Sequence, residues 1–206
     1  MRSSIAASTL LFAAVVGAAA PVPMARAAET QPGSDTAVVQ PARDSRAVAG
    51  VLETARRLFA EGRSDEALAA LDAGLEASPR DAQLRFQRGV VLADSGRIEA
   101  AMETFEALTQ EFPELPEPHN NLAALYAARG DLDRARAALE EALRALPTYA
   151  LAHENLGDIH LRLAERAYLR ASSADATNRA AREKLALARE LVAKISPTGT
   201  RPARAR

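Results

Sequence analysis

The chain has 206 residues, a formal net charge of −1, 4% aromatic residues, no cysteine and no tryptophan. The absence of cysteine excludes disulfides, thiolate metal sites and cysteine nucleophiles. The near-neutral charge gives no general reason to expect nucleic acid as a partner. Abundant alanine with few aromatics favours close-packed small helices over a β-sandwich or a large enzyme.

Residues 1–27 are expected to be a signal peptide for export. Arg2 precedes an almost uninterrupted apolar run over residues 5–20, and Ala25, Arg26 and Ala27 form a small-x-small site that predicts cleavage after Ala27. An uncleaved anchor is the alternative, but the run is shorter than the ~20 apolar residues of a spanning helix. We therefore expect a periplasmic or secreted mature chain without membrane insertion.

Two segments outside the periodic part are predicted to be disordered. Residues 28–47 carry Pro32, Gly33 and Pro41 without hydrophobic periodicity, as in a disordered leader. Residues 196–206 contain three arginines and are expected to form a disordered basic tail, solvated rather than bound to an anionic surface.

The region between these segments has a 34-residue period. Three glycines mark it, and three prolines follow at the same spacing: Gly62, Gly96, Gly130, Pro79, Pro113 and Pro147. Glycine closes a helix in the left-handed conformation, and proline prevents helix continuation. A period of this length indicates stacked helix pairs, which we place at residues 48–81, 82–115 and 116–149.

Local signals set the expected helix ends. The first pair is predicted as helices 48–61 and 65–77, with Ser64 as the N-cap of the second, and Asp81 and Asp131 are expected to cap later helices. A glycine inside a helix costs ~1 kcal/mol relative to alanine. We therefore expect Gly89 to allow close approach of the neighbouring helix at Ala101.

These residues resemble the tetratricopeptide repeat family. Residues 116–149 match its pattern of residue sizes throughout, at Leu122, Ala123, Tyr126, Gly130, Ala135, Leu139, Ala142 and Pro147. The two preceding repeats match with a few departures, such as Arg88 and Gly74. The resemblance implies an all-α fold, a right-handed superhelical stack of helix-turn-helix repeats.

A fourth, degenerate repeat is expected over residues 150–176. Ala164 stands where the family has glycine, so its two helices are predicted to fuse into one helix over about residues 149–172. A tight turn near Ala164 is the alternative. Residues 177–195 are expected to form an amphipathic capping helix, with one face on the stack and one in water.

The resemblance also implies a concave groove lined by the first helix of each repeat. Groove positions hold a mixture of amides, acids and one arginine: Arg56, Gln83, Gln87, Glu117, Asn120, Asn121, Glu154, Asn155 and Asp158. Asn121 and Asn155 occupy the position where the family often holds a peptide backbone, a task that suits a carboxamide because it both donates and accepts. In family members that bind a carboxylate, certain groove positions are basic, and none of these positions is basic here. The groove instead mixes amides with acids, so a neutral or basic partner segment is expected.

Metal and catalytic sites are not expected. His119, His153 and His160 have no pairing on one helix face that would favour zinc. No phosphate-binding glycine loop or catalytic carboxylate pair stands out. We predict a non-enzymatic scaffold without cofactors that binds a protein or peptide in its groove. The alternative is an accessory subunit or oligomer that docks by its helix edges or convex surface, and the oligomeric state is left open.

Overall fold

The computed structural model describes residues 40–195, which contain eight α-helices and no strand. The expected signal peptide, most of the leader (residues 28–39) and the expected basic tail lie outside the described residues. The helices are α1 (Gln40–Ala60), α2 (Ser64–Ala77), α3 (Ala82–Asp94), α4 (Ile98–Glu111), α5 (Pro116–Ala128), α6 (Leu132–Ala145), α7 (Ala150–Ala174) and α8 (Arg179–Ile195). The predicted all-α repeat fold is confirmed.

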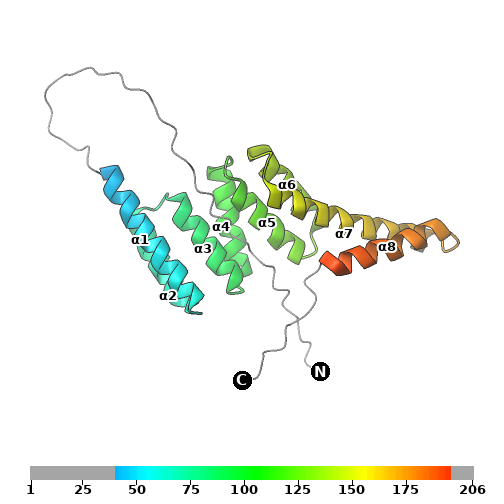
Figure 1. Cartoon of the computed structure of the whole chain (residues 1–206), viewed down its shortest axis with the longest axis horizontal. Helices are drawn as coiled ribbons and strands as arrows, with labels where there is room; N and C mark the ends of the chain where they lie inside the picture. Colours follow the sequence, from blue (N-terminus) through cyan, green and yellow to red (C-terminus); the bar gives the residue numbers. More distant parts are fainter. Residues whose placement is uncertain (1–39, 196–206) are drawn as a thin grey trace, which may run out of the picture.

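The helices form a superhelical stack of antiparallel pairs (Figure 1). Each helix packs against its neighbours in the chain, and α1, α3, α5 and α7 also contact one another in succession. The second helices α2, α4 and α6 make no such contacts among themselves. Because the first helices lie closer together, the stack curves with α1, α3, α5 and α7 on its inner side.

Glycine turns separate the helices of the first three pairs, as predicted. Gly62, Gly96 and Gly130 have φ values of 77°, 79° and 78°, which only glycine adopts without strain. In the first turn the Arg63 N–H donates to the Leu58 carbonyl at 2.9 Å, and the Gly62 N–H donates to the Phe59 carbonyl at 2.9 Å. These two bonds satisfy carbonyls that would otherwise have no partner at the helix end.

The first repeat differs from its prediction at both helix starts. Helix α1 begins at Gln40, so the expected disordered leader is wrong for residues 40–47. Pro41 does not prevent this, because proline is tolerated in the first turn of a helix. Ser64 is also not an N-cap: Arg63 occupies that position, and no side chain caps α2.

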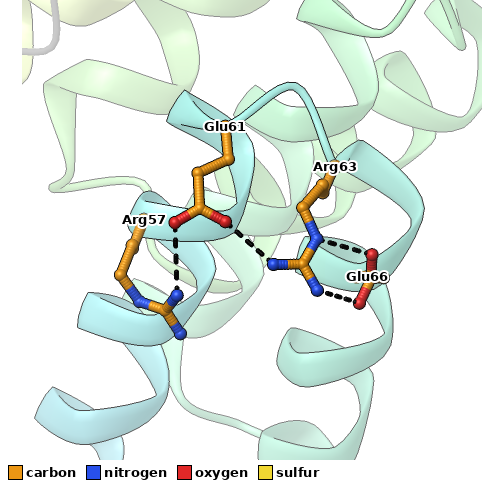
Figure 2. A network of polar contacts seen from close by, with 4 residues as sticks. All are labelled: Arg57, Glu61, Arg63 and Glu66. Carbon is orange, nitrogen blue, oxygen red and sulfur yellow. Dashed lines mark hydrogen bonds and ion pairs between the residues drawn. The ribbon is translucent and has the colours of Figure 1, made fainter.

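Arginine contacts surround the turn at which α2 begins (Figure 2). The Arg63 guanidinium donates to both carboxylate oxygens of Glu66, at 2.7 and 2.5 Å, and to Glu61 at 2.8 Å. Arg57 donates to the other oxygen of Glu61 at 3.2 Å. The hydrogen bonds from Arg63 hold the pKa values of Glu61 and Glu66 below their usual range. This network ties the end of α1 to the first turn of α2.

The other two expected N-caps are confirmed. The Asp81 carboxylate accepts from the Leu84 N–H at 2.9 Å, and the Asp131 carboxylate accepts from the Arg134 N–H at 3.2 Å. Each satisfies a donor in the first turn of its helix that has no partner within the helix.

Close packing at Gly89 has a different cause from the one predicted. A Cβ at this position would lie 2.7 Å from Cε1 and 2.8 Å from Cζ of Phe105, whose ring is completely buried. The aromatic side chain on α4, rather than Ala101, is therefore what excludes a side chain at Gly89. The core here includes Leu84, Val91 and Leu108, and a second cluster around Leu139 and Ile159 continues it toward α7.

Helix α7 is continuous over 25 residues, which confirms the predicted fusion of the fourth pair and rules out a turn near Ala164. Helix α8 begins at Arg179, two residues after the predicted start, and folds back along the distal half of α7 (Figure 1). Ala181, Leu185 and Ala188 are buried on its inner face, and α7 is its only contact among the described helices. The pair caps the stack.

Candidate functional site

The candidate site is the concave surface formed by α1, α3, α5 and α7, called here the groove. The nine predicted site residues all lie on these four helices: Arg56, Gln83, Gln87, Glu117, Asn120, Asn121, Glu154, Asn155 and Asp158. Successive first helices contact each other. A side chain on one of them can therefore reach its counterpart on the next.

The structure brings two of the predicted residues together between α5 and α7. The Asn155 carboxamide donates to the Asn120 Oδ1 at 2.8 Å. Asn120 is 4% exposed and Asn155 is half-buried. The bond leaves the Asn120 Nδ2 as a donor and the Asn155 Oδ1 as an acceptor, the pair of groups that complements a peptide bond.

A second, looser contact joins α1 and α3. The Arg56 Nε donates to the Gln87 Oε1 at 3.4 Å, at the outer limit of hydrogen-bond geometry. Arg56 is exposed, and the nearby Gln83 is also open to solvent. No hydrogen bond or ion pair between site residues bridges α3 and α5 in the described part of the chain, so the predicted residues fall into an N-terminal and a C-terminal group.

The C-terminal group of the groove is acidic. Glu154 and Asp158 are four residues apart on α7 and therefore share one helix face. Burial raises the pKa of Asp158, and the Glu154 carboxylate raises it further, while Arg162 opposes the shift. Burial also raises the pKa of Tyr149, with a contribution from Glu117 on α5. This part of the groove carries negative charge that is only partly compensated.

Two of the histidines considered as metal ligands have structural partners. The imidazole Nε2 of His119 lies 3.3 Å from the Pro113 carbonyl, and that of His153 lies 2.9 Å from the Pro147 carbonyl. Each histidine thus ties the start of a first helix to the end of the preceding pair. No group of three potential metal ligands occurs within residues 40–195.

Several arginines of the described region form ion pairs between repeats, which sequence reasoning missed. Acids 34 residues apart each bind an arginine of the next repeat: Asp65 with Arg97, Glu99 with Arg129 and Asp133 with Arg166. Glu111 binds Arg80 at the end of the preceding repeat and Arg85 within its own repeat. The equal spacing of the acids was the available signal. These contacts lie at the protein surface, and such pairs contribute little individually.

Comparisons with known proteins agree with this architecture. Two family models, both described as "Tetratricopeptide repeat", match residues 52–116 and 92–159. Together they span residues 52–159, more than half of the chain. The chain belongs to the tetratricopeptide repeat family.

One curated relative and two solved structures illustrate the similarity. Protein O-mannosyl-transferase TMTC1 of Homo sapiens is 30% identical over 118 residues, which are 53% of this chain but 13% of that protein. The chain therefore spans only a small part of this relative. The first repeat domain of RPAP3, solved with the HSP90 peptide SRMEEVD, has a TM-score of 0.53 and 21% identity over 59% of this chain and 95% of its own. A thermophilic repeat protein of Thermus thermophilus, TTC0263, has a TM-score of 0.51 and 23% identity over 69% of this chain and 81% of its own.

Proposed function

We propose that this protein is a non-enzymatic interaction scaffold that binds an extended peptide, or an extended segment of a partner protein, in the groove. The hydrogen-bonded pair Asn120–Asn155 is the observation that carries the proposal, because it leaves one donor and one acceptor next to each other on the concave wall. An extended strand offers its carbonyl and N–H groups in alternation, so one such pair can hold one residue of the ligand.

Relatives of the same fold support this proposal. The RPAP3 domain was solved with a bound HSP90 peptide, which shows that the fold can hold a peptide. Some relatives, such as TMTC1, are enzymes that carry these repeats. The described residues of this chain contain no cluster of metal ligands, and the predicted groove residues are amides, acids and one arginine.

We further propose that the protein acts in the bacterial envelope after export. The pattern of residues 1–27 supports this location, since a charged start, an apolar run and a small-x-small site are typical of a cleaved signal. No helix within residues 40–195 has the length and apolarity needed to cross a bilayer. Fractionation of the native cells with mass spectrometry of the mature chain tests this: a periplasmic protein that starts at Ala28 is expected, and retention in the cytoplasm with an intact N-terminus contradicts it.

Crosslinking in native cells followed by partner identification tests groove binding. The double variant Asn120→Ala/Asn155→Ala is expected to lose most of the crosslinked partner while keeping the helical circular dichroism spectrum. Glu76→Ala/Glu103→Ala is the matched control, because both residues are exposed on second helices. Unchanged capture by the groove variant would contradict the proposal.

A second candidate function has its own supporting observation. Leu169, Leu187 and Leu191 on the α7–α8 pair are 43%, 62% and 44% exposed. Exposed leucines at the end of a repeat stack favour docking of an accessory subunit or a second copy through this edge. In that case Leu187→Ser/Leu191→Ser abolishes partner capture, and the asparagine variant leaves it unchanged.

A further inference from the structure

Negative charge that is only partly compensated lies at the C-terminal end of the groove, between α5 and α7. Glu154 and Asp158 share a face of α7, and Glu117 lies on α5 where its charge reaches Tyr149. Arg162 is the basic residue that acts on Asp158, and no salt bridge joins it to Asp158 or Glu154 among the described residues. Repulsion between Glu154 and Asp158 has a cost that a bound cation would remove.

Two buried asparagines of α5 have carboxamide groups without a hydrogen-bond partner among residues 40–195. Asn121 is 8% exposed, and its carboxamide makes no hydrogen bond within residues 40–195. The Asn120 Nδ2 likewise has no acceptor in that region, although Asn120 is 4% exposed and its Oδ1 is engaged by Asn155. Solvent can reach the carboxamide atoms of Asn120 and Asn121 that have no partner. A ligand carbonyl can therefore take the place of water at the free Nδ2 of Asn120.

We infer that this end of the groove holds one lysine or arginine residue of the bound segment, with its side-chain cation beside Glu154 and Asp158 and its backbone carbonyl at the free Nδ2 of Asn120. The inference rests on the proposed groove binding and adds the chemistry of the ligand. One residue of an extended peptide supplies both complements, because its carbonyl and its side chain project in different directions from the same backbone.

Other ligands fit this end of the groove less well. A carboxylate terminus would meet Glu154 and Asp158, and like charges repel it. A divalent metal would require several ligand oxygens converging on one point, and no such group occurs in the described part of the chain. A neutral peptide satisfies the amides but leaves the acids uncompensated.

Nuclear magnetic resonance titration tests the inference with the full chain and blocked heptapeptides of sequence Ac-Gly-Ser-Ala-X-Ala-Ser-Gly-NH2. X is lysine, arginine, norleucine or glutamate, so that only the side chain differs. The lysine and arginine peptides are expected to shift the side-chain amide signals of Asn120 and Asn155 and to bind about fivefold or more tightly than the norleucine peptide, with an advantage that declines in high salt. Glu154→Gln/Asp158→Asn is expected to remove this advantage, whereas Glu76→Gln/Glu103→Gln leaves it intact.

Three results separate this inference from the proposed function. If all peptides bind equally, or none shifts these amide signals, the inference is wrong. If the native partner still requires Asn120 and Asn155 but binds equally well to the Glu154→Gln/Asp158→Asn variant, the groove is used without charge selection. If the peptides show no preference for lysine or arginine and the Asn120→Ala/Asn155→Ala variant still captures the partner, both the inference and the proposed groove binding are wrong.

Discussion

The buried ring of Phe105 occupies the space that a side chain at Gly89 would need, because a Cβ there would lie 2.7 Å from its Cε1 atom. Helices α3 and α4 pack against each other at this point. The repeat that they form also packs on the next repeat in the stack. Gly89 therefore leaves the room that the Phe105 ring occupies between α3 and α4.

Replacement of Gly89 by alanine is expected to lower the free energy of unfolding by about 1–3 kcal/mol, because overpacking outweighs the gain in helix propensity. Gly157→Ala is the matched control, since a Cβ at this helical glycine meets nothing within 4 Å. The control is expected to gain up to about 1 kcal/mol. Chemical denaturation measures the free energy of unfolding of both variants. Equal stabilisation by both alanines would show that the Phe105 ring can move aside at little cost.

Removal of the Asp81 cap is expected to destabilise the stack by about 1 kcal/mol. The carboxylate accepts from the Leu84 N–H at the start of α3, and alanine leaves that donor without a partner. Ser64→Ala is the comparison, because Ser64 makes no capping bond. Its unfolding midpoint in urea is expected to remain near that of the wild type. A larger loss from Ser64→Ala than from Asp81→Ala would contradict the assignment of the caps.

Acid is expected to weaken the ion pairs of Glu111 with Arg80, just before α3, and with Arg85, within α3. Hydrogen bonds from Arg85 and Arg80 hold the pKa of Glu111 below its ordinary value of 4.5. The folded-state pKa is lowered, so this contribution is present above pH 4.5 and is lost as the pH falls through the lowered pKa. Glu111→Gln should therefore be less stable near neutral pH and lose less stability on acidification, which urea titrations across this range measure. An identical acid profile for variant and wild type would disprove the contribution.

High pH is expected to lower the free energy of unfolding through ionisation of Tyr126. Burial raises the pKa of its phenol above 10.0, and the hydrogen bond to Glu106 at 2.9 Å raises it further. Since the folded-state pKa is raised, the contribution of this group is full below 10.0 and is lost as the pH rises through the raised value.

Tyr126→Phe tests this dependence. The variant is expected to lose about 1 kcal/mol at neutral pH, the net value of one hydrogen bond, and to show a flatter decline of stability in alkali. Ultraviolet absorbance titration of the phenols gives an independent measure, in which the variant lacks one late-titrating tyrosine. A decline in alkali as steep as that of the wild type would show that another group is responsible.

Most of the fold was predictable from the sequence because its determinants are local. Gly62, Gly96 and Gly130 end helices through their own backbone conformation, whatever surrounds them. The absence of such a glycine at Ala164 likewise predicted one continuous helix α7. The start of α1 at Gln40 was missed because its polar, proline-containing first residues have the composition of a disordered segment.

The candidate site was predictable only in part. The period placed the groove residues on successive first helices, so their membership of one surface followed from sequence. Their pairing did not, since Asn155 donates to Asn120 rather than to Asn121, and Arg56 reaches Gln87. Such choices depend on the offset and rotation between neighbouring helices, which no local signal records.

The sequence by itself therefore determined the repeat length, the helix ends marked by glycine and the surface on which polar residues gather. These follow from backbone conformation and from a spacing that repeats every 34 residues. Only the tertiary structure decided that Phe105 opposes Gly89, that Asn120 and Asn155 bond, and that Asp65, Glu99 and Asp133 each hold an arginine of the next repeat. The physical reason is that these contacts join residues on different helices, and their geometry exists only after the repeats have packed together.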